Sequence, residues 1–99
     1  VAAGPLQMAS DQPWNCFARK NGQLISGGTA SRIYNPGETV HLEIRKGPDG
    51  YTCIFGDNAP VSAGFDFPLT AIDSDFVYVG MFVSKSADVT FQNISLTLQ

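Results

Sequence analysis

One hairpin pattern constrains this chain more than any other feature of its sequence. Apolar Val40, Leu42 and Ile44 alternate with polar residues, which is the period of two expected for a strand with one buried face. The tetrapeptide Gly47-Pro48-Asp49-Gly50 follows, and its residue types favour a tight turn. The sequence therefore predicts a strand over residues 39–46 that turns back into a partner strand over residues 51–56.

The turn also predicts which residues face one another across this hairpin. From the turn outward, the expected pairs are Lys46–Tyr51, Arg45–Thr52, Ile44–Cys53, Glu43–Ile54 and Leu42–Phe55. The side chains of Leu42, Ile44, Cys53 and Phe55 then share the face that is expected to be buried in the core. A shift of one residue would turn every one of these side chains to the other face.

Short apolar runs separated by turn residues continue along the rest of the chain. The sequence holds ten glycines and six prolines, and no window shows a clean helical period. Further strands are expected at 14–20, 23–26, 31–34, 76–84 and 89–98, and Leu6 and Met8 mark a first one. Residues 57–75 form a long connection that is either functional or carries a short strand of its own. About seven or eight antiparallel strands predict an all-β fold, a two-sheet β-sandwich of jelly-roll type.

Composition and charge narrow the class of protein. Hydrophobic residues make up 43% of the chain and charged residues 15%, a balance that favours a packed core over disorder. We expect a single domain over residues 1–99, in which residues 1–10 could include sequence foreign to the domain. No apolar run approaches the ~20 residues that cross a bilayer, so no membrane partner is expected. A net charge of −3 argues against general nucleic-acid binding, which needs a basic field over many phosphates.

The side chains that catalysis and metal binding require are few. Cys16 and Cys53 are the only cysteines, and they could form a disulfide or remain as two buried thiols. A tetrahedral zinc site needs about four Cys or His ligands, and His41 is the only candidate besides the two cysteines. His41 falls on the polar face of its strand and is expected at the surface. Because acid–base pairs, phosphate loops and nucleophile elbows are not evident, we expect no enzyme activity.

The C-terminal part of the sequence carries a family pattern. Residues 76–94 read as an aromatic-Val-Gly-x-Phe strand, a short Ala-Asp turn and a Val-Thr-Phe-x-Asn-Ile strand. Residues 34–44, the tripeptide 51–53 and the segment Cys16-Phe17-Ala18-Arg19 fit the same pattern. Over roughly residues 14–98 the chain resembles concanavalin-like β-sandwich carbohydrate-binding modules appended to pectate lyases and other bacterial enzymes that degrade plant cell walls. Many of those modules are longer, with extra strands before the segment that matches 14–20.

The resemblance implies a secreted, non-catalytic module that targets an attached polysaccharide-degrading enzyme to plant cell-wall glycan. It would be a monomer joined to a catalytic domain, and its expected ligand is the acidic pectin homogalacturonan. Lysine and arginine bind uronate carboxylates, and arginine can do so in a bidentate fork. The candidate cations are Arg19, Lys20, Arg32, Arg45, Lys46 and Lys85.

Two other functions stay open at this stage. Trp14, Tyr34 and Tyr51 could stack on a neutral glycan such as xylan or β-glucan, although core packing is the favoured role of Trp14. Alternatively, the chain could be an accessory sandwich that binds no sugar. No cofactor is expected, but sandwich modules of the lectin type often hold a structural Ca²⁺. The candidate oxygen ligands are Asp57, Asp66, Asp73, Asp75 and Asp88, for which ordinary solvated loop acids are the alternative.

Overall fold

The computed structural model describes residues 1–5, 14–30, 35, 37–68, 75–82 and 88–98. These residues form six strands and no helix: β1 (Ala2–Pro5), β2 (Trp14–Lys20), β3 (Gln23–Thr29), β4 (Leu42–Gly47), β5 (Gly50–Phe55) and β6 (Val61–Ser62). No helix long and apolar enough to cross a membrane occurs among them. The prediction of an all-β protein is confirmed.

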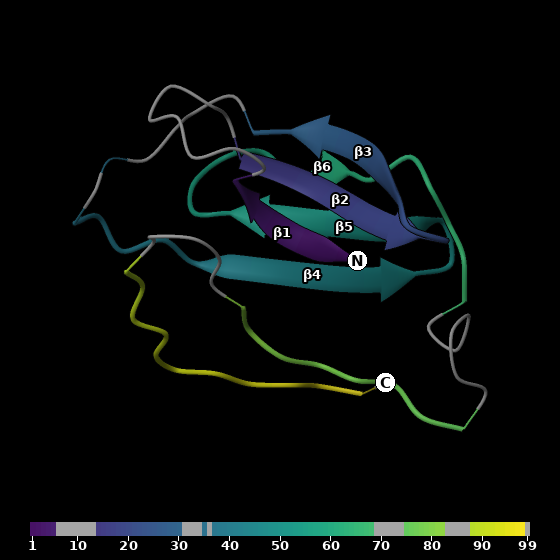
Figure 1. The fold of residues 1–99 in the computed structure, drawn as a ribbon. Helices are drawn as coiled ribbons and strands as arrows, with labels where there is room; N and C mark the ends of the chain where they lie inside the picture. Colours follow the sequence, from purple (N-terminus) through teal and green to yellow (C-terminus); the bar gives the residue numbers. More distant parts are fainter. Residues whose placement is uncertain (6–13, 31–34, 36, 69–74, 83–87, 99) are drawn as a thin grey trace. The chain divides into compact units, whose positions relative to one another are not determined.

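The strands form two three-stranded antiparallel sheets, β1-β2-β3 and β4-β5-β6 (Figure 1). The strand predicted at 14–20 is confirmed as β2, and β3 starts at Gln23 as predicted but continues to Thr29. Asn21 and Gly22 join them with φ angles of 52° and 76°, as a two-residue hairpin turn requires. The β4–β5 register matches all five predicted pairs. Within the long connection, β6 is the short strand that the sequence allowed.

The two sheets pack against each other in the unit Val1–Pro68 through the strand pairs β1–β4, β2–β5 and β3–β6. A disulfide between Cys16 of β2 and Cys53 of β5 crosses from one sheet to the other, with the Cα atoms 5.7 Å apart. Both half-cystines and Phe55 are fully buried. Gly27 of β3 shows how close the layers come, because a Cβ there would lie 2.5 Å from the carbonyl oxygen of Ala63. The disulfide thus settles the question that the sequence left open.

Of the four residues predicted for the buried face of the hairpin, only two are buried. Cys53 and Phe55 are buried, but their partners Ile44 and Leu42 are 43% and 38% exposed. β4 lies at one edge of its sheet, and β1 of the other sheet packs against it. β1 begins Ala-Ala-Gly, and these small residues cannot cover two large aliphatic side chains. The prediction that Leu42 and Ile44 are core residues is therefore wrong.

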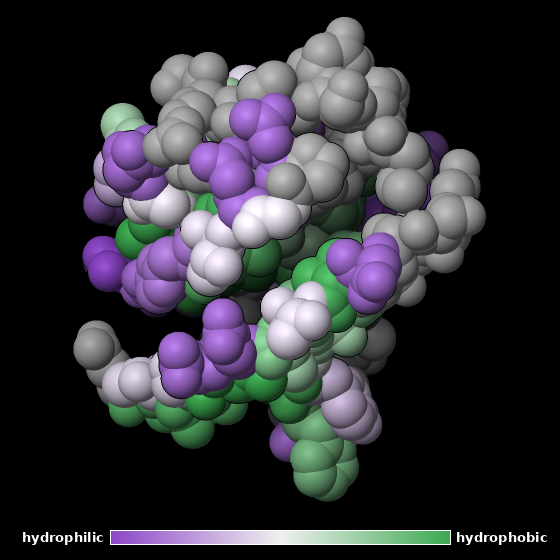
Figure 2. Space-filling model, turned by 90° about the vertical axis from the view of Figure 1, so that its left-hand side faces the viewer, coloured by the Kyte–Doolittle hydropathy of each residue, from purple (hydrophilic) through white to green (hydrophobic). Residues whose placement is uncertain are grey.

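The unit Leu69–Gln99 is described over residues 75–82 and 88–98, all of which are exposed and none of which lies in a strand. Its apolar side chains are exposed, with Tyr78 81% and Leu98 84% exposed. Figure 2 shows both hydrophilic and hydrophobic groups at the surface. The strands predicted at 76–84 and 89–98 are not formed in these residues. Strands that are apolar on both faces need hydrogen-bonded neighbours and covering layers, and a lone hairpin is marginally stable. The strand predictions at 31–34 and at Leu6 and Met8 lie outside the described residues.

Candidate functional site

Two of the predicted cations, one from each sheet, lie over neighbouring aromatic rings. The Nζ atom of Lys20 is 5.7 Å from the centroid of the Phe67 ring, and that of Lys46 is 5.5 Å from the centroid of the Tyr51 ring. These two rings are themselves 5.5 Å apart, centroid to centroid. Together with Phe65 and Asp66, which lie beside them, these residues form what we call the basic aromatic site.

Strand ends bring the two lysines to the same side of this unit. Lys20 is the last residue of β2, and Lys46 is next to last in β4, opposite Tyr51 in the ladder. The arrowheads of β2 and β4, one in each sheet, point to the same end in Figure 1. The ring contacts of Lys20 and Lys46 place both strand ends near Tyr51 and Phe67. The site therefore depends on the contact between the sheets as well as on each hairpin.

The phenylalanines come from the segment that follows β6. The N–H of Ala63 donates to the carbonyl oxygen of Tyr51 over 2.9 Å, which carries the pairing one residue past the strand. Gly64 then turns the chain with a φ of 73°. Phe65 and Phe67, two residues apart, stack with centroids 5.4 Å apart and planes 7° from parallel. The hydroxyl of Tyr51 donates to the carbonyl oxygen of Phe67 over 2.8 Å and holds the segment against the hairpin.

Gly50 allows this segment to lie on the hairpin turn. Its φ of 111° is a conformation that side chains disfavour. A Cβ at this position would lie 3.0 Å from the carbonyl oxygen of Phe65 and 3.4 Å from the Cβ of Asp66. Both the backbone conformation and the space at this position thus require glycine.

A carboxylate compensates one of the two cations. Lys46 Nζ lies 2.8 Å from Oδ1 of Asp66 and donates to the carbonyl oxygen of Gly47, also over 2.8 Å. Lys20 makes no ion pair within the described ranges. Burial raises the pKa of the Tyr51 hydroxyl, and the charge of Asp66 adds to this rise while that of Lys46 opposes it. The site therefore combines one compensated and one uncompensated ammonium group.

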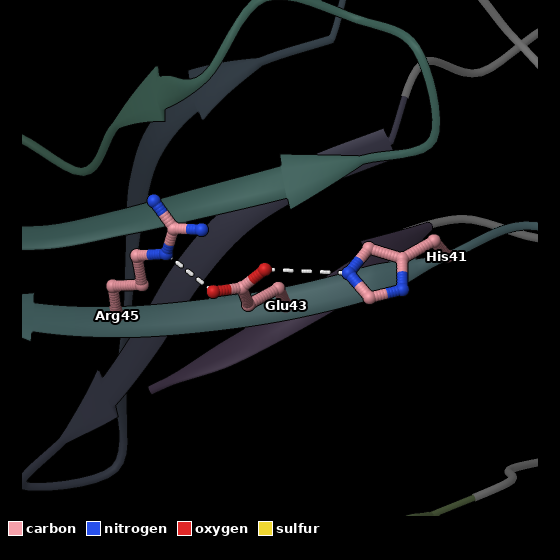
Figure 3. Close-up of polar contacts among 3 residues, drawn as sticks. All are labelled: His41, Glu43 and Arg45. Atoms are coloured by element: carbon pink, nitrogen blue, oxygen red, sulfur yellow. Dashed lines mark hydrogen bonds and ion pairs between the residues drawn. The ribbon is translucent and has the colours of Figure 1, made fainter. Parts of the chain in front are cut away.

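Arg45 belongs to a different group, on the opposite face of β4 (Figure 3). Its Nε donates to Oε1 of Glu43, and Nε2 of His41 lies 3.3 Å from the other carboxylate oxygen. The hydrogen bond from Arg45, followed by that with His41, lowers the pKa of Glu43. Because successive side chains of a strand point to opposite faces, Arg45 and Lys46 cannot share one site. The exposed position of His41 was predicted and is confirmed.

The remaining candidates are more scattered. Arg19 is exposed and precedes Lys20 in β2, so its side chain points to the other face. Trp14 is half-buried and packs edge-on against Phe55 at 6.0 Å, which is the core role that the sequence favoured. Tyr51 is only 3% exposed, so its ring packs under Lys46 and offers no open surface on which a sugar could stack. The expectation that Tyr51 forms an open stacking surface is therefore corrected. Arg32, Tyr34 and Lys85 lie outside the described residues.

Three residues of the basic aromatic site were not predicted from the sequence as ligand contacts. Phe65 and Phe67 are half-buried, and Asp66 was considered only as a calcium ligand. The alternating Phe-Asp-Phe sequence was the available signal, because it places both rings on one side of an extended segment. In the part of the chain that the structure describes, no group of three or more His, Cys, Asp or Glu side chains could hold a metal ion.

Comparisons with protein-family models, curated proteins and solved structures give no match to this chain.

Proposed function

We propose that this chain is a non-catalytic carbohydrate-binding module whose ligand is an acidic plant cell-wall polysaccharide, homogalacturonan. The observation that carries the proposal is the meeting of Lys20 and Lys46, from separate sheets, over one aromatic cluster. A polyuronate presents a carboxylate on each sugar, and ammonium groups form charge-assisted hydrogen bonds with carboxylates. The half-buried rings of Phe65 and Phe67 offer apolar surface for the C–H face of a sugar ring.

The negative net charge of the chain is compatible with an acidic ligand. A bound group senses the local field more than the sum of charges, and in this site two ammonium groups face a single carboxylate. Contacts of this exposed kind contribute about 0.2–1 kcal/mol each. Binding would therefore rest on several sugars in register along the chain and would weaken with added salt.

The proposal includes the wider setting that the sequence resemblance implies. The chain would adopt a concanavalin-like jelly-roll sandwich, act outside the cell and target an attached polysaccharide-degrading enzyme to its substrate. Two antiparallel sheets in contact support the sandwich. The disulfide between Cys16 and Cys53 supports an oxidising compartment, where such bonds persist.

Affinity electrophoresis in gels containing polygalacturonate tests this function. Lys20→Met and Lys46→Met remove the charge but keep an apolar stem, and Arg45→Gln is the matched control on the opposite face of β4. We expect retardation of the unmodified chain, weaker retardation of both methionine variants, and little change for Arg45→Gln. Retardation should fall with added salt and with methyl-esterified pectin. Equal effects of Lys46→Met and Arg45→Gln would contradict the assignment of this site.

The stacked rings of Phe65 and Phe67 favour a second candidate, a neutral glycan such as xylan or β-glucan. That function predicts binding that is indifferent to salt, retained in Lys20→Met and lost in Phe67→Ala. Isothermal titration with xylan and β-glucan oligosaccharides distinguishes the two functions. If neither acidic nor neutral glycans bind, the chain is an accessory domain and both candidates fail.

A further inference from the structure

We propose that Asp66 mimics the ligand within the free protein. Its carboxylate pairs with Lys46 at the position that a uronate carboxylate takes on binding. This inference rests on the proposed function and deepens it. It makes Asp66 a residue that sets both the affinity and the specificity of the basic aromatic site.

The contacts of the Lys46 ammonium group show which of its partners a ligand would displace. The Lys46 ammonium contacts the Tyr51 ring, the carbonyl oxygen of Gly47 and the carboxylate of Asp66. The first two are fixed, because Tyr51 is buried and Gly47 lies in the backbone of β4. The Asp66 side chain is 49% exposed, whereas that of Lys46 is 27% exposed. The carboxylate is thus the one contact of Lys46 that can leave without disturbing a strand or the core.

Only the side chain of Asp66 has to move for this exchange. Its backbone neighbours are held on both sides, because the rings of Phe65 and Phe67 stack on each other and both pack near Tyr51. The hydrogen bond from Tyr51 to the carbonyl of Phe67 fixes the segment further. Rotation of the Asp66 side chain into water would open Lys46 while the aromatic surface stays in place.

The exchange is selective because it replaces one carboxylate with another. A uronate restores the charge compensation that Lys46 loses when Asp66 leaves. A neutral sugar or a methyl-esterified uronate offers no such replacement, so Asp66 stays on Lys46 and such a ligand binds without this lysine. Asp66 would therefore lower the affinity for polyuronate and, with it, the preference for polyuronate over neutral chains.

The test is the substitution Asp66→Asn, which keeps the shape of the side chain and removes its charge. The matched control is Asp49→Asn in the β4–β5 turn, where the exposed Asp49 forms no ion pair within the described ranges. Both substitutions raise the net charge of −3 by one unit. Titration with polygalacturonate oligosaccharides should show affinity about two- to fivefold higher for Asp66→Asn than for Asp49→Asn. The gain should disappear when Lys46→Met is added.

Each outcome bears on the inference. Equal affinities of the two asparagine variants, or a gain that survives Lys46→Met, would overturn it while the function stands. If the unmodified chain fails to bind polygalacturonate, the function fails first. Near-ultraviolet circular dichroism checks that each variant folds, and Asp66→Ala serves if the asparagine variant does not. Asp66→Asn should also widen the preference for polygalacturonate over methyl-esterified pectin, and an unchanged ratio would refute the role in specificity.

Discussion

The disulfide between Cys16 and Cys53 offers the sharpest test of how this fold is held together. It joins positions 37 residues apart and crosses from β2 to β5, the central strands of the two sheets. In the chain-entropy account, closing a loop of 37 residues costs the unfolded chain about 13 cal/mol/K, or about 4 kcal/mol near room temperature. Small domains have total stabilities of about 5–15 kcal/mol, so the bond would supply a large share.

We therefore expect that the variant with Cys16→Ala and Cys53→Ala loses about 4 kcal/mol of unfolding free energy, or fails to fold. Urea unfolding followed by tryptophan fluorescence measures this, because Trp14 packs against Phe55 beside the bond. The unmodified chain with and without a reducing agent is a second comparison that leaves the sequence intact. A loss below about 1 kcal/mol would refute the reasoning and would show that the sheets hold together without the bond.

Three further predictions concern single residues. Gly50→Ala should lower the free energy of unfolding in urea by about 1–3 kcal/mol, because it strains the backbone and brings a Cβ close to the carbonyl oxygen of Phe65. Gly22→Ala is the control, because a Cβ there would enter open space. A smaller loss of stability for Gly50→Ala than for Gly22→Ala would contradict the close approach. Glu43 has a lowered pKa, so the stability it contributes is present above its unfolded pKa and is lost as the pH falls through its folded value, below 4.5. The difference between the unmodified chain and Glu43→Gln in urea unfolding should thus be larger at pH 7 than at pH 2, and a constant difference would refute the ion pair. Tyr51→Phe removes the hydrogen bond to Phe67 and should cost about 1 kcal/mol at neutral pH. Because the pKa of Tyr51 is raised, its ionisation opposes folding as the pH rises, and Tyr51→Phe should lessen the loss of stability above about pH 10. An equal alkaline loss in both proteins would count against this.

Local chemistry accounts for what could be predicted of the fold. The register of the β4–β5 hairpin follows from the alternation of apolar and polar residues and from the turn at residues 47–50. Both signals lie within a short stretch of sequence. The bounds of β2 follow in the same way from its apolar run and the Asn21-Gly22 turn. The exposure of Leu42 and Ile44 could not be predicted, because it depends on which strand lies opposite β4 and on how small its side chains are. The strand predictions also failed over residues 76–82 and 89–98, for a related reason: an apolar strand needs neighbours that its own sequence does not specify.

The candidate site was predictable only in part. Alternation along a strand already implies that Arg19 and Lys20, or Arg45 and Lys46, point to opposite faces, so at most half of these four cations could meet. Which two meet depends on how the sheets stack, and the answer is Lys20 with Lys46. Their aromatic surroundings come from a segment that joins the hairpin through Gly50 and Gly64, whose roles only the backbone conformation reveals.

The two lysines of the site are not equivalent, and their difference predicts which of them Asp66 opposes in binding. Lys20 has no carboxylate partner in the described part of the chain, whereas Lys46 is already compensated by Asp66. A polyuronate would therefore pair with Lys20 without displacing a carboxylate, whereas it gains Lys46 only when Asp66 leaves. It follows that Lys46→Met should weaken binding more in the Asp66→Asn background than in the unmodified chain, while the effect of Lys20→Met should be similar in both. A double-mutant cycle measured by titration with polygalacturonate oligosaccharides checks this. A larger change in the effect of Lys20→Met than in that of Lys46→Met would contradict the assignment of Asp66 to Lys46.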